Sequence, residues 1–144
     1  MSEPFQRPVT AAQIRATEEW QATYPGAEVV YEQDADEGDG AGFDNLELGA
    51  HAWTYYHAPA TWEAVVDTYR AQLTAFGWHR TDAGGPYWTD QRWSSDDRPG
   101  RSIALTHQPQ QPWEAWSHDP SQGTVFSVMY RVDPADRRDV NDRA

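Results

Sequence analysis

The sequence predicts an α+β domain with a single antiparallel sheet of about five strands, one main amphipathic helix on one face and a short N-terminal helix. Apolar residues recur at helical spacing in one long stretch, residues 61–76, which predicts the main helix. The other apolar runs are short, alternate with polar residues and are separated by Gly- and Pro-containing segments, as in hairpins. A parallel sheet is disfavoured because only one helix is placed to cross over between strands.

Both ends of the main helix are marked in the sequence. Thr61 is a good N-cap residue, and Glu63 places a carboxylate in the first turn, where the helix dipole favours it. Gly77 suits the left-handed residue that ends many helices, and Trp78 is expected to pack back on the last turn. No stripe residue is reactive, so the helix is predicted to build the core rather than an active site. The expected apolar stripe consists of Trp62, Val65, Val66, Tyr69, Leu73 and Phe76.

The remaining elements follow in order along the chain. Thr10 and Gln13 form a capping box that opens a short helix ending near residue 23, and a turn at Pro25 leads into a first strand. An acidic, Gly-rich loop then covers residues 34–45. One domain is predicted over residues 1–132, followed by a disordered tail at 133–144. The later strands are expected at about 46–58, 83–93, 101–107 and 124–132, with a long excursion at 108–123.

The core must be built largely from aromatic rings. Leu, Ile, Val and Phe together number only 19, and with a net charge of -12 this composition is typical of disordered chains. Eight Trp and seven Tyr join the four Phe, however, and each buried ring removes about 150–250 Å² from water. The sequence therefore predicts a folded, tryptophan-rich domain.

The main helix and its flank carry a V-x-x-x-Y-x-x-x-L-x-x-x-G-W run, formed by Val65, Tyr69, Leu73, Gly77 and Trp78. This run, following an extended aromatic strand, resembles a loose group of small bacterial α+β domains of no agreed function, some of which are lipid-anchored. The resemblance covers at most residues 26–110 and rests on core positions. It implies the fold class and carries no catalytic residue over to this chain.

The second strand has two different faces. Alternation directs Leu46, Leu48, Ala50, Ala52, Thr54 and Tyr56 toward the helix-covered core. His51, Trp53, Tyr55 and His57 then point to the opposite face, where a row of rings is a candidate platform for a binding partner. The other interpretation is that another segment folds over these rings. The sequence leaves both open.

Acidic residues are concentrated early in the chain. Residues 1–50 carry eleven Asp or Glu against two Arg, and Asp34, Asp36, Glu37 and Asp39 form the acidic part of the loop. The spacing fails the calcium-loop pattern, because no glycine stands at its turn position. Such a field repels phosphate backbones and anionic lipids, which argues against nucleic acid and membranes as partners. A protein with a basic surface is the natural complement.

Chemistry-bearing motifs are missing from the sequence. It has no Cys, no phosphate-binding loop, no hydrolase elbow and no zinc-protease motif, and its five His are scattered, so neither cofactor nor metal is expected. The start of the chain lacks the features of a secretory signal, so a cytoplasmic location is expected. Trp113 and Trp116, three residues apart in the long excursion, are candidate anchors for a partner or caps of a pocket.

These observations favour a non-enzymatic, acidic protein-interaction domain, in its most concrete form an immunity-type or inhibitor protein that covers a basic surface of its partner. The alternative is a small-ligand-binding or enzymatic domain, with an aromatic pocket between Trp53, Tyr55, Trp93 and the Trp113/Trp116 excursion. A third interpretation is that the same rings join copies of the chain in a homo-oligomer.

Overall fold

The protein is a single antiparallel sheet with all of its described helices on one face. The structure, a computed structural model, describes residues 9–36, 49–95, 100–108 and 123–132. Six strands are hydrogen-bonded in the order β1-β2-β6-β5-β4-β3, which confirms the α+β prediction. The strands are β1 (Glu28–Ala35), β2 (His51–Ala58), β3 (Trp78–Arg80), β4 (Asp90–Ser95), β5 (Arg101–His107) and β6 (Thr124–Val132).

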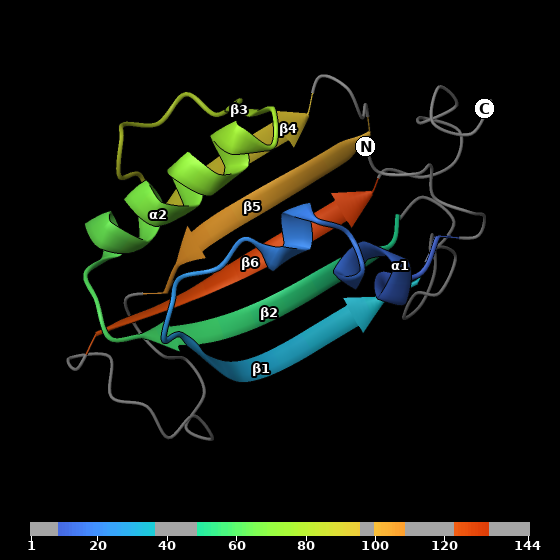
Figure 1. Cartoon of the computed structure of the whole chain (residues 1–144), viewed down its shortest axis with the longest axis horizontal. Coiled ribbons are helices and arrows are strands. Elements are labelled where there is room, and N and C mark those ends of the chain that lie inside the picture. Colours follow the sequence, from blue (N-terminus) through green and yellow to red (C-terminus); the bar gives the residue numbers. More distant parts are fainter. Residues whose placement is uncertain (1–8, 37–48, 96–99, 109–122, 133–144) are drawn as a thin grey trace.

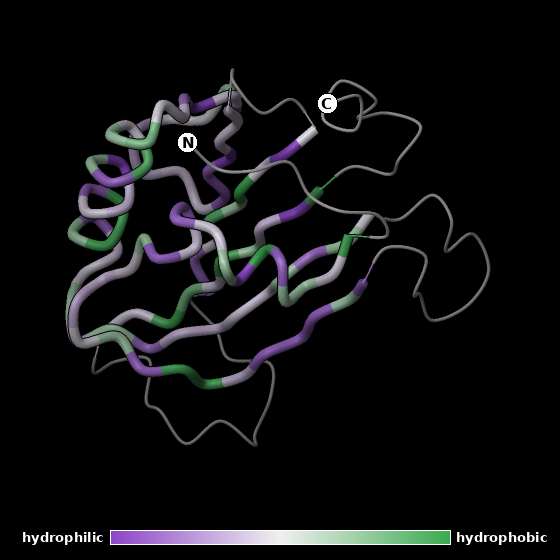
Figure 2. Tube along the Cα trace, turned by 45° about the vertical axis from the view of Figure 1, so that its right-hand side comes forward, coloured by the Kyte–Doolittle hydropathy of each residue, from purple (hydrophilic) through white to green (hydrophobic). Residues whose placement is uncertain are grey.

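The main helix α2 (Trp62–Ala75) covers the β5-β4-β3 half of the sheet, as Figure 1 shows. The N-terminal segment, with helix α1 (Ala11–Arg15) and the 3₁₀ turn η1 (Glu19–Gln21), lies over the β1-β2-β6 half. Hydrophobic and hydrophilic residues are both present along α2 and along β1 (Figure 2). Together, α2 and the N-terminal segment cover one face of the sheet.

Both predicted helix caps are present. The Thr61 hydroxyl accepts a hydrogen bond from the Ala64 N–H, and the Thr10 hydroxyl accepts one from the Gln13 N–H. Gly77 adopts the left-handed conformation at φ 88°, which suits a residue without a Cβ atom. These local signals place the start and the end of α2 where the sequence predicts them.

The strand β3 is absent from the sequence prediction, and the end of α2 differs from it. Trp78 does not merely pack back on the helix: it begins β3, and its ring makes an edge-to-face contact with Tyr130, 5.5 Å between centroids. Phe76 is not part of the apolar stripe, because it is the C-cap residue, where the chain leaves the helix, and it is 39% exposed. The predicted strand at 83–93 begins only at Asp90, because residues 83–89 form a turn around the Arg80 side chain.

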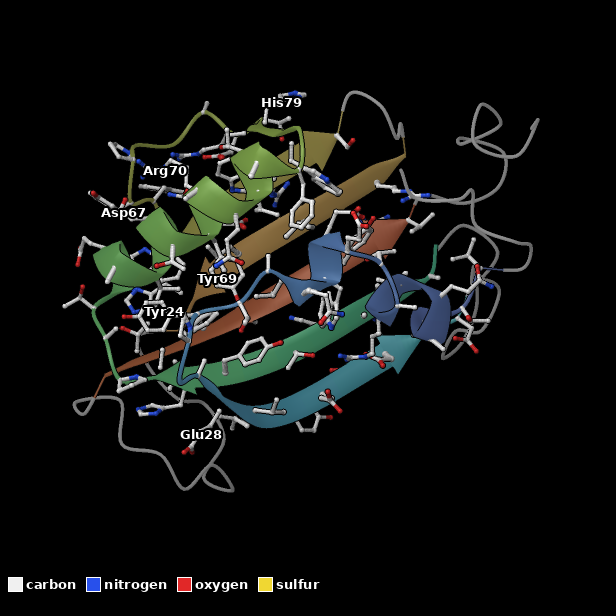
Figure 3. All side chains as sticks on the ribbon, in the orientation of Figure 1. Tyr24, Glu28, Asp67, Tyr69, Arg70 and His79 are labelled. Carbon is white, nitrogen blue, oxygen red and sulfur yellow. The ribbon has the colours of Figure 1, made fainter. Side chains whose placement is uncertain are left out.

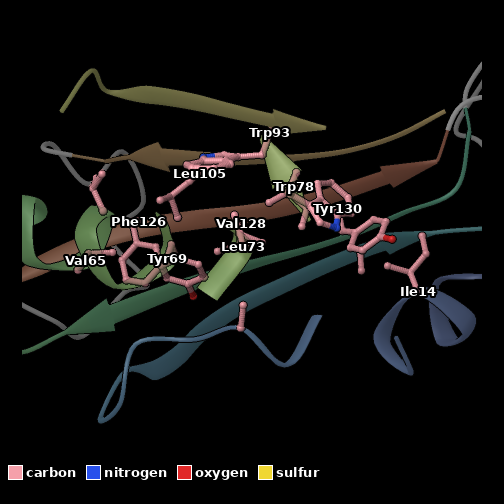
Figure 4. Packing of buried hydrophobic residues seen from close by; sticks show 14 of the residues in the cluster. Ile14, Val65, Tyr69, Leu73, Trp78, Trp93, Leu105, Phe126, Val128 and Tyr130 are labelled. Carbon is pink, nitrogen blue, oxygen red and sulfur yellow. The ribbon is translucent and has the colours of Figure 1, made fainter. Parts of the chain in front are cut away.

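The core lies between the helices and the covered face of the sheet (Figure 4). Its centre is aromatic, with the Tyr69 ring edge-on to Phe126 at 5.8 Å and the Phe126 ring stacked on Tyr56 at 5.4 Å. This confirms the prediction of a ring-rich core. The largest fully buried side chains are Tyr69, Tyr130, Phe126, Ile14, Leu73 and Leu105.

A buried polar cluster ties the N-terminal segment to the sheet. The Tyr130 hydroxyl donates to a Glu19 carboxylate oxygen at 2.8 Å and accepts from Arg101 at 3.4 Å, and all three residues are at most 6% exposed. Burial raises the pKa of Tyr130, Arg101 lowers it and Glu19 raises it again, so the phenol keeps its proton and acts as the donor. Glu19 thereby fixes η1 above the centre of the sheet.

Candidate functional site

The face of the sheet turned away from the helices carries a line of rings, called here the aromatic row: Tyr31, Tyr55, Trp53 and His51. Their centroids follow at 5.9 Å from Tyr31 to Tyr55, 5.3 Å from Tyr55 to Trp53 and 6.3 Å from Trp53 to His51. Alternation in β2 produces this row, because Ala52 and Thr54 point into the core and are fully buried. The predicted assignment of the two faces of this strand is therefore confirmed for its described residues.

Accessibility differs along the aromatic row. Tyr31 is 45% exposed, Trp53 and His51 are half-buried, and Tyr55 is only 4% exposed. Tyr55 lies between two rings of the row, which cover much of its surface. The accessible area of the row therefore belongs to Tyr31, Trp53 and His51.

The chemistry of the row is that of neutral, amphipathic rings. Burial lowers the pKa of His51, with Asp34 raising it and Arg131 lowering it further, so the imidazole is uncharged at neutral pH. Burial and the neighbouring Tyr31 raise the pKa of Tyr55, so its phenol keeps its proton. Each of these rings combines an apolar body with a polar group.

His57, the last predicted member of the ring set, stands apart from the row. It lies at the other end of β2, in register with Glu28 on β1 and Val125 on β6. It is half-buried.

Uncharged side chains of β6 and β5 lie beside the row on the sheet face turned away from the helices. In register with Trp53 and Tyr55, β6 presents Met129 and Ser127, and β5 presents Ala104 and Thr106 beside them. The face becomes charged at β4, where Arg92 and Asp90 form an ion pair at 3.0 Å. Between Trp53 and Tyr55 on β2 and the ion pair on β4, this face therefore carries uncharged side chains.

Asp34 and Asp36 have roles within the molecule. Asp34 belongs to β1 rather than to a loop, and it accepts two hydrogen bonds from Arg15 at 2.6 and 2.8 Å and one from the Trp53 N–H. Burial raises the pKa of Asp34, but the Arg15 and Trp53 hydrogen bonds outweigh it, so the net pKa is lowered. Asp36 accepts from the Ala11 N–H at 2.8 Å. These two carboxylates hold α1 on the sheet, which the predicted docking role did not include.

The remaining residues of the predicted sites either lie outside the described residues or belong to the core. Glu37, Asp39, Trp113 and Trp116 lie outside the described residues. Trp93 is 4% exposed and points into the core on the helix-covered face of the sheet. The predicted pocket that joins Trp53, Tyr55 and Trp93 is therefore wrong, because the sheet separates Trp93 from the other two.

A cavity of about 490 Å³, called here the end pocket, opens where α2 begins, β5 ends and β6 starts. Its walls include Trp62 and Glu63 from the first turn of α2, Tyr87 from the turn before β4, and His107 from the end of β5. Sequence analysis assigned Trp62 to the core and His107 to a scattered set of histidines. Only the long-range pairing of β5 with β6 brings these residues together, so no local pattern signals the pocket.

Metal ligands do not gather in this fold: within the described residues, no three His, Asp or Glu side chains are placed to hold one ion. Nor is any described helix both long and apolar enough to cross a membrane.

Comparison with known proteins gives no relative: no family matches the chain, and neither a curated protein nor a solved structure is found to be similar to it.

Proposed function

We propose that the protein is a non-enzymatic interaction domain that binds a protein with a basic surface through the aromatic row and the adjoining edge of the sheet. The observation that supports this best is the accessible part of the row, in which Tyr31, at 45% exposure, lies on the edge strand β1 and the half-buried Trp53 and His51 lie on β2. Large amphipathic rings are the side chains that most often anchor protein interfaces.

Charge supports the choice of a basic partner. The chain has a net charge of -12, and one of its acidic residues, Glu28, lies on β1 in register with His57. Glu28 projects from the outer side of β1 (Figure 3). In such a complex, the charges mainly set the association rate and its dependence on salt, while buried rings supply most of the affinity.

The most concrete form of this proposal is an inhibitor or immunity-type protein, which covers the basic surface of a toxin or of a nucleic-acid-binding enzyme. A protein of this kind needs no catalytic group of its own. It must present a rigid surface, and a sheet backed by a packed core supplies one.

The experiment is a pull-down from the native host at low and high salt, with wild type and two matched variants. Trp53→Ala removes a ring of the row, whereas Trp88→Ala removes a ring that is 57% exposed on the turn before β4. We expect one stoichiometric basic partner, retained by Trp88→Ala, weakened at high salt and lost with Trp53→Ala. Equal capture by both variants, or capture that is unaffected by salt, contradicts the proposal. Circular dichroism of both variants controls for folding.

A second candidate function is small-ligand binding, which the end pocket favours. Its volume lies in the range of about 300–1,000 Å³ that is usual for ligand sites. This pocket lies at the junction of α2, β5 and β6 and not at the position that the sequence suggests.

A further inference from the structure

The end pocket has rigid aromatic walls. The Trp62 indole stacks on the His107 imidazole with centroids 4.8 Å apart and planes 9° apart. The Trp62 indole N–H also donates to the Tyr87 carbonyl at 3.1 Å, which ties the turn before β4 to the start of α2. Trp62 is only 6% exposed, so it supports the wall, whereas Tyr87 is 41% exposed and offers its ring to a ligand.

Tyr87 already attracts a planar cation. The guanidinium carbon of Arg70 lies 5.9 Å from the centroid of the Tyr87 ring. Arg70 is itself paired with Asp67 at 3.1 Å, and both lie on α2 (Figure 3). A guanidinium carbon at this distance makes a cation–π contact with one face of the ring.

The charge of the pocket also favours a cation. Among the described side chains that line it, Glu63 is the only carboxylate and none is Lys or Arg, and burial lowers the pKa of His107 more than Glu63 raises it. The N-terminus of α2 contributes about half a positive charge, which the full charge of Glu63 exceeds. An anion would therefore meet net repulsion.

We propose that the end pocket binds a guanidinium group, carried by free arginine or by an arginine side chain in a peptide, with Glu63 as its carboxylate partner and Tyr87 as its stacking surface. A guanidinium fits better than an ammonium because it is planar, stacks on rings, and presents a fork of N–H donors to a carboxylate. A divalent metal ion is a poorer match, since a single carboxylate provides too few ligands. This inference names the ligand class for the second candidate function, small-ligand binding in the end pocket, and does not depend on the interaction proposed for the aromatic row.

The test is an NMR titration that follows the imidazole protons of His107 and the indole N–H of Trp62. The probes are free arginine and N-acetyl-arginine-N-methylamide, and the matched neutral probe is N-acetyl-citrulline-N-methylamide, which has nearly the same shape without the charge. We expect saturable shifts at both residues with a Kd of about 1 mM or below for an arginine probe, and binding at least tenfold weaker for citrulline. Binding of both arginine probes indicates a site for the free amino acid or a side chain, and binding of the blocked probe alone indicates a peptide side chain.

The variant that isolates the ion pair is Glu63→Gln, and its matched control is Glu18→Gln, which removes one exposed negative charge outside the pocket. We expect Glu63→Gln to weaken arginine binding at least tenfold and Glu18→Gln to leave it within about twofold. Equal affinity for citrulline, equal affinity of the two variants, or no shift up to about 10 mM arginine overturns the inference. A urea unfolding curve for each variant shows that a loss of binding is not a loss of fold. A failed pull-down with a successful titration removes the proposed function and leaves this inference intact.

Discussion

Replacing Tyr130 with Phe tests whether the buried polar cluster stabilises the fold. The change deletes one hydroxyl, which donates to Glu19 at 2.8 Å and accepts from Arg101 at 3.4 Å. A hydrogen bond to a charged group contributes about 1.5–3 kcal/mol. After the change, the Glu19 carboxylate still has its ion pair with Arg101 at 3.9 Å. Because all three residues are buried, water cannot replace the lost partner. We expect a loss of about 2–3 kcal/mol in the free energy of unfolding.

The assay is urea unfolding followed by tryptophan fluorescence. With a slope of about 2 kcal/mol per molar urea, the midpoint should fall by about 1–1.5 M. Tyr87→Phe is the matched control, since its hydroxyl lies at the surface, 3.4 and 3.5 Å from the Asp67 carboxylate oxygens, and its removal should cost under about 0.5 kcal/mol. A double-mutant cycle of Tyr130→Phe with Glu19→Gln should give a coupling of about 1 kcal/mol or more. If Tyr130→Phe costs no more than Tyr87→Phe, the cluster does not stabilise the fold.

Two further predictions concern stability. Gly123→Ala should destabilise the protein far more than Gly77→Ala. Both glycines have positive φ, but a Cβ atom at Gly123 would come within 2.2 Å of a backbone oxygen at the end of β2, whereas Gly77 has open space. Similar urea midpoints for the two variants would argue against this account. Hydrogen bonds from Arg80 hold the pKa of Asp82 well below its usual range, against a smaller opposing effect of burial. The stabilisation from Asp82 is therefore complete above the unfolded pKa of about 4 and is lost as pH falls toward the folded pKa. In urea unfolding, the difference in unfolding free energy between wild type and Asp82→Asn should shrink between about pH 4 and pH 2. A difference that stays constant over this range would contradict the prediction.

Local signals in the sequence were sufficient for the main helix and for the two faces of the second strand. Thr61 and Gly77 mark helix ends through hydrogen bonds and backbone conformation within a few residues, and strand alternation needs only the identity of neighbours. These features do not depend on where the rest of the chain lies, which is why they could be read in advance.

Features that depend on distant partners could not be predicted in this way. The sequence predicts an acidic loop at Asp34 because its partner Arg15 lies 19 residues away in the sequence, and Glu19 contacts Tyr130 across 111 residues. The three-residue strand β3 is too short to show a period of its own, and it is defined by its pairing with β4. The end pocket likewise exists only after α2, β5 and β6 have come together.

The position of β6 in the sheet has a consequence for how the chain folds. This last described strand is not at an edge: it lies between β2 and β5 and joins the β1-β2 ribbon to the β5-β4-β3 sheet. During synthesis, neither half can complete its pairing until residues 124–132 have left the ribosome, and each half meanwhile exposes an unpaired strand edge. Pairing between distant segments is also slow to form. The two half-sheets are therefore expected to join only after β6 has been synthesised, and until then each can pair with another chain instead.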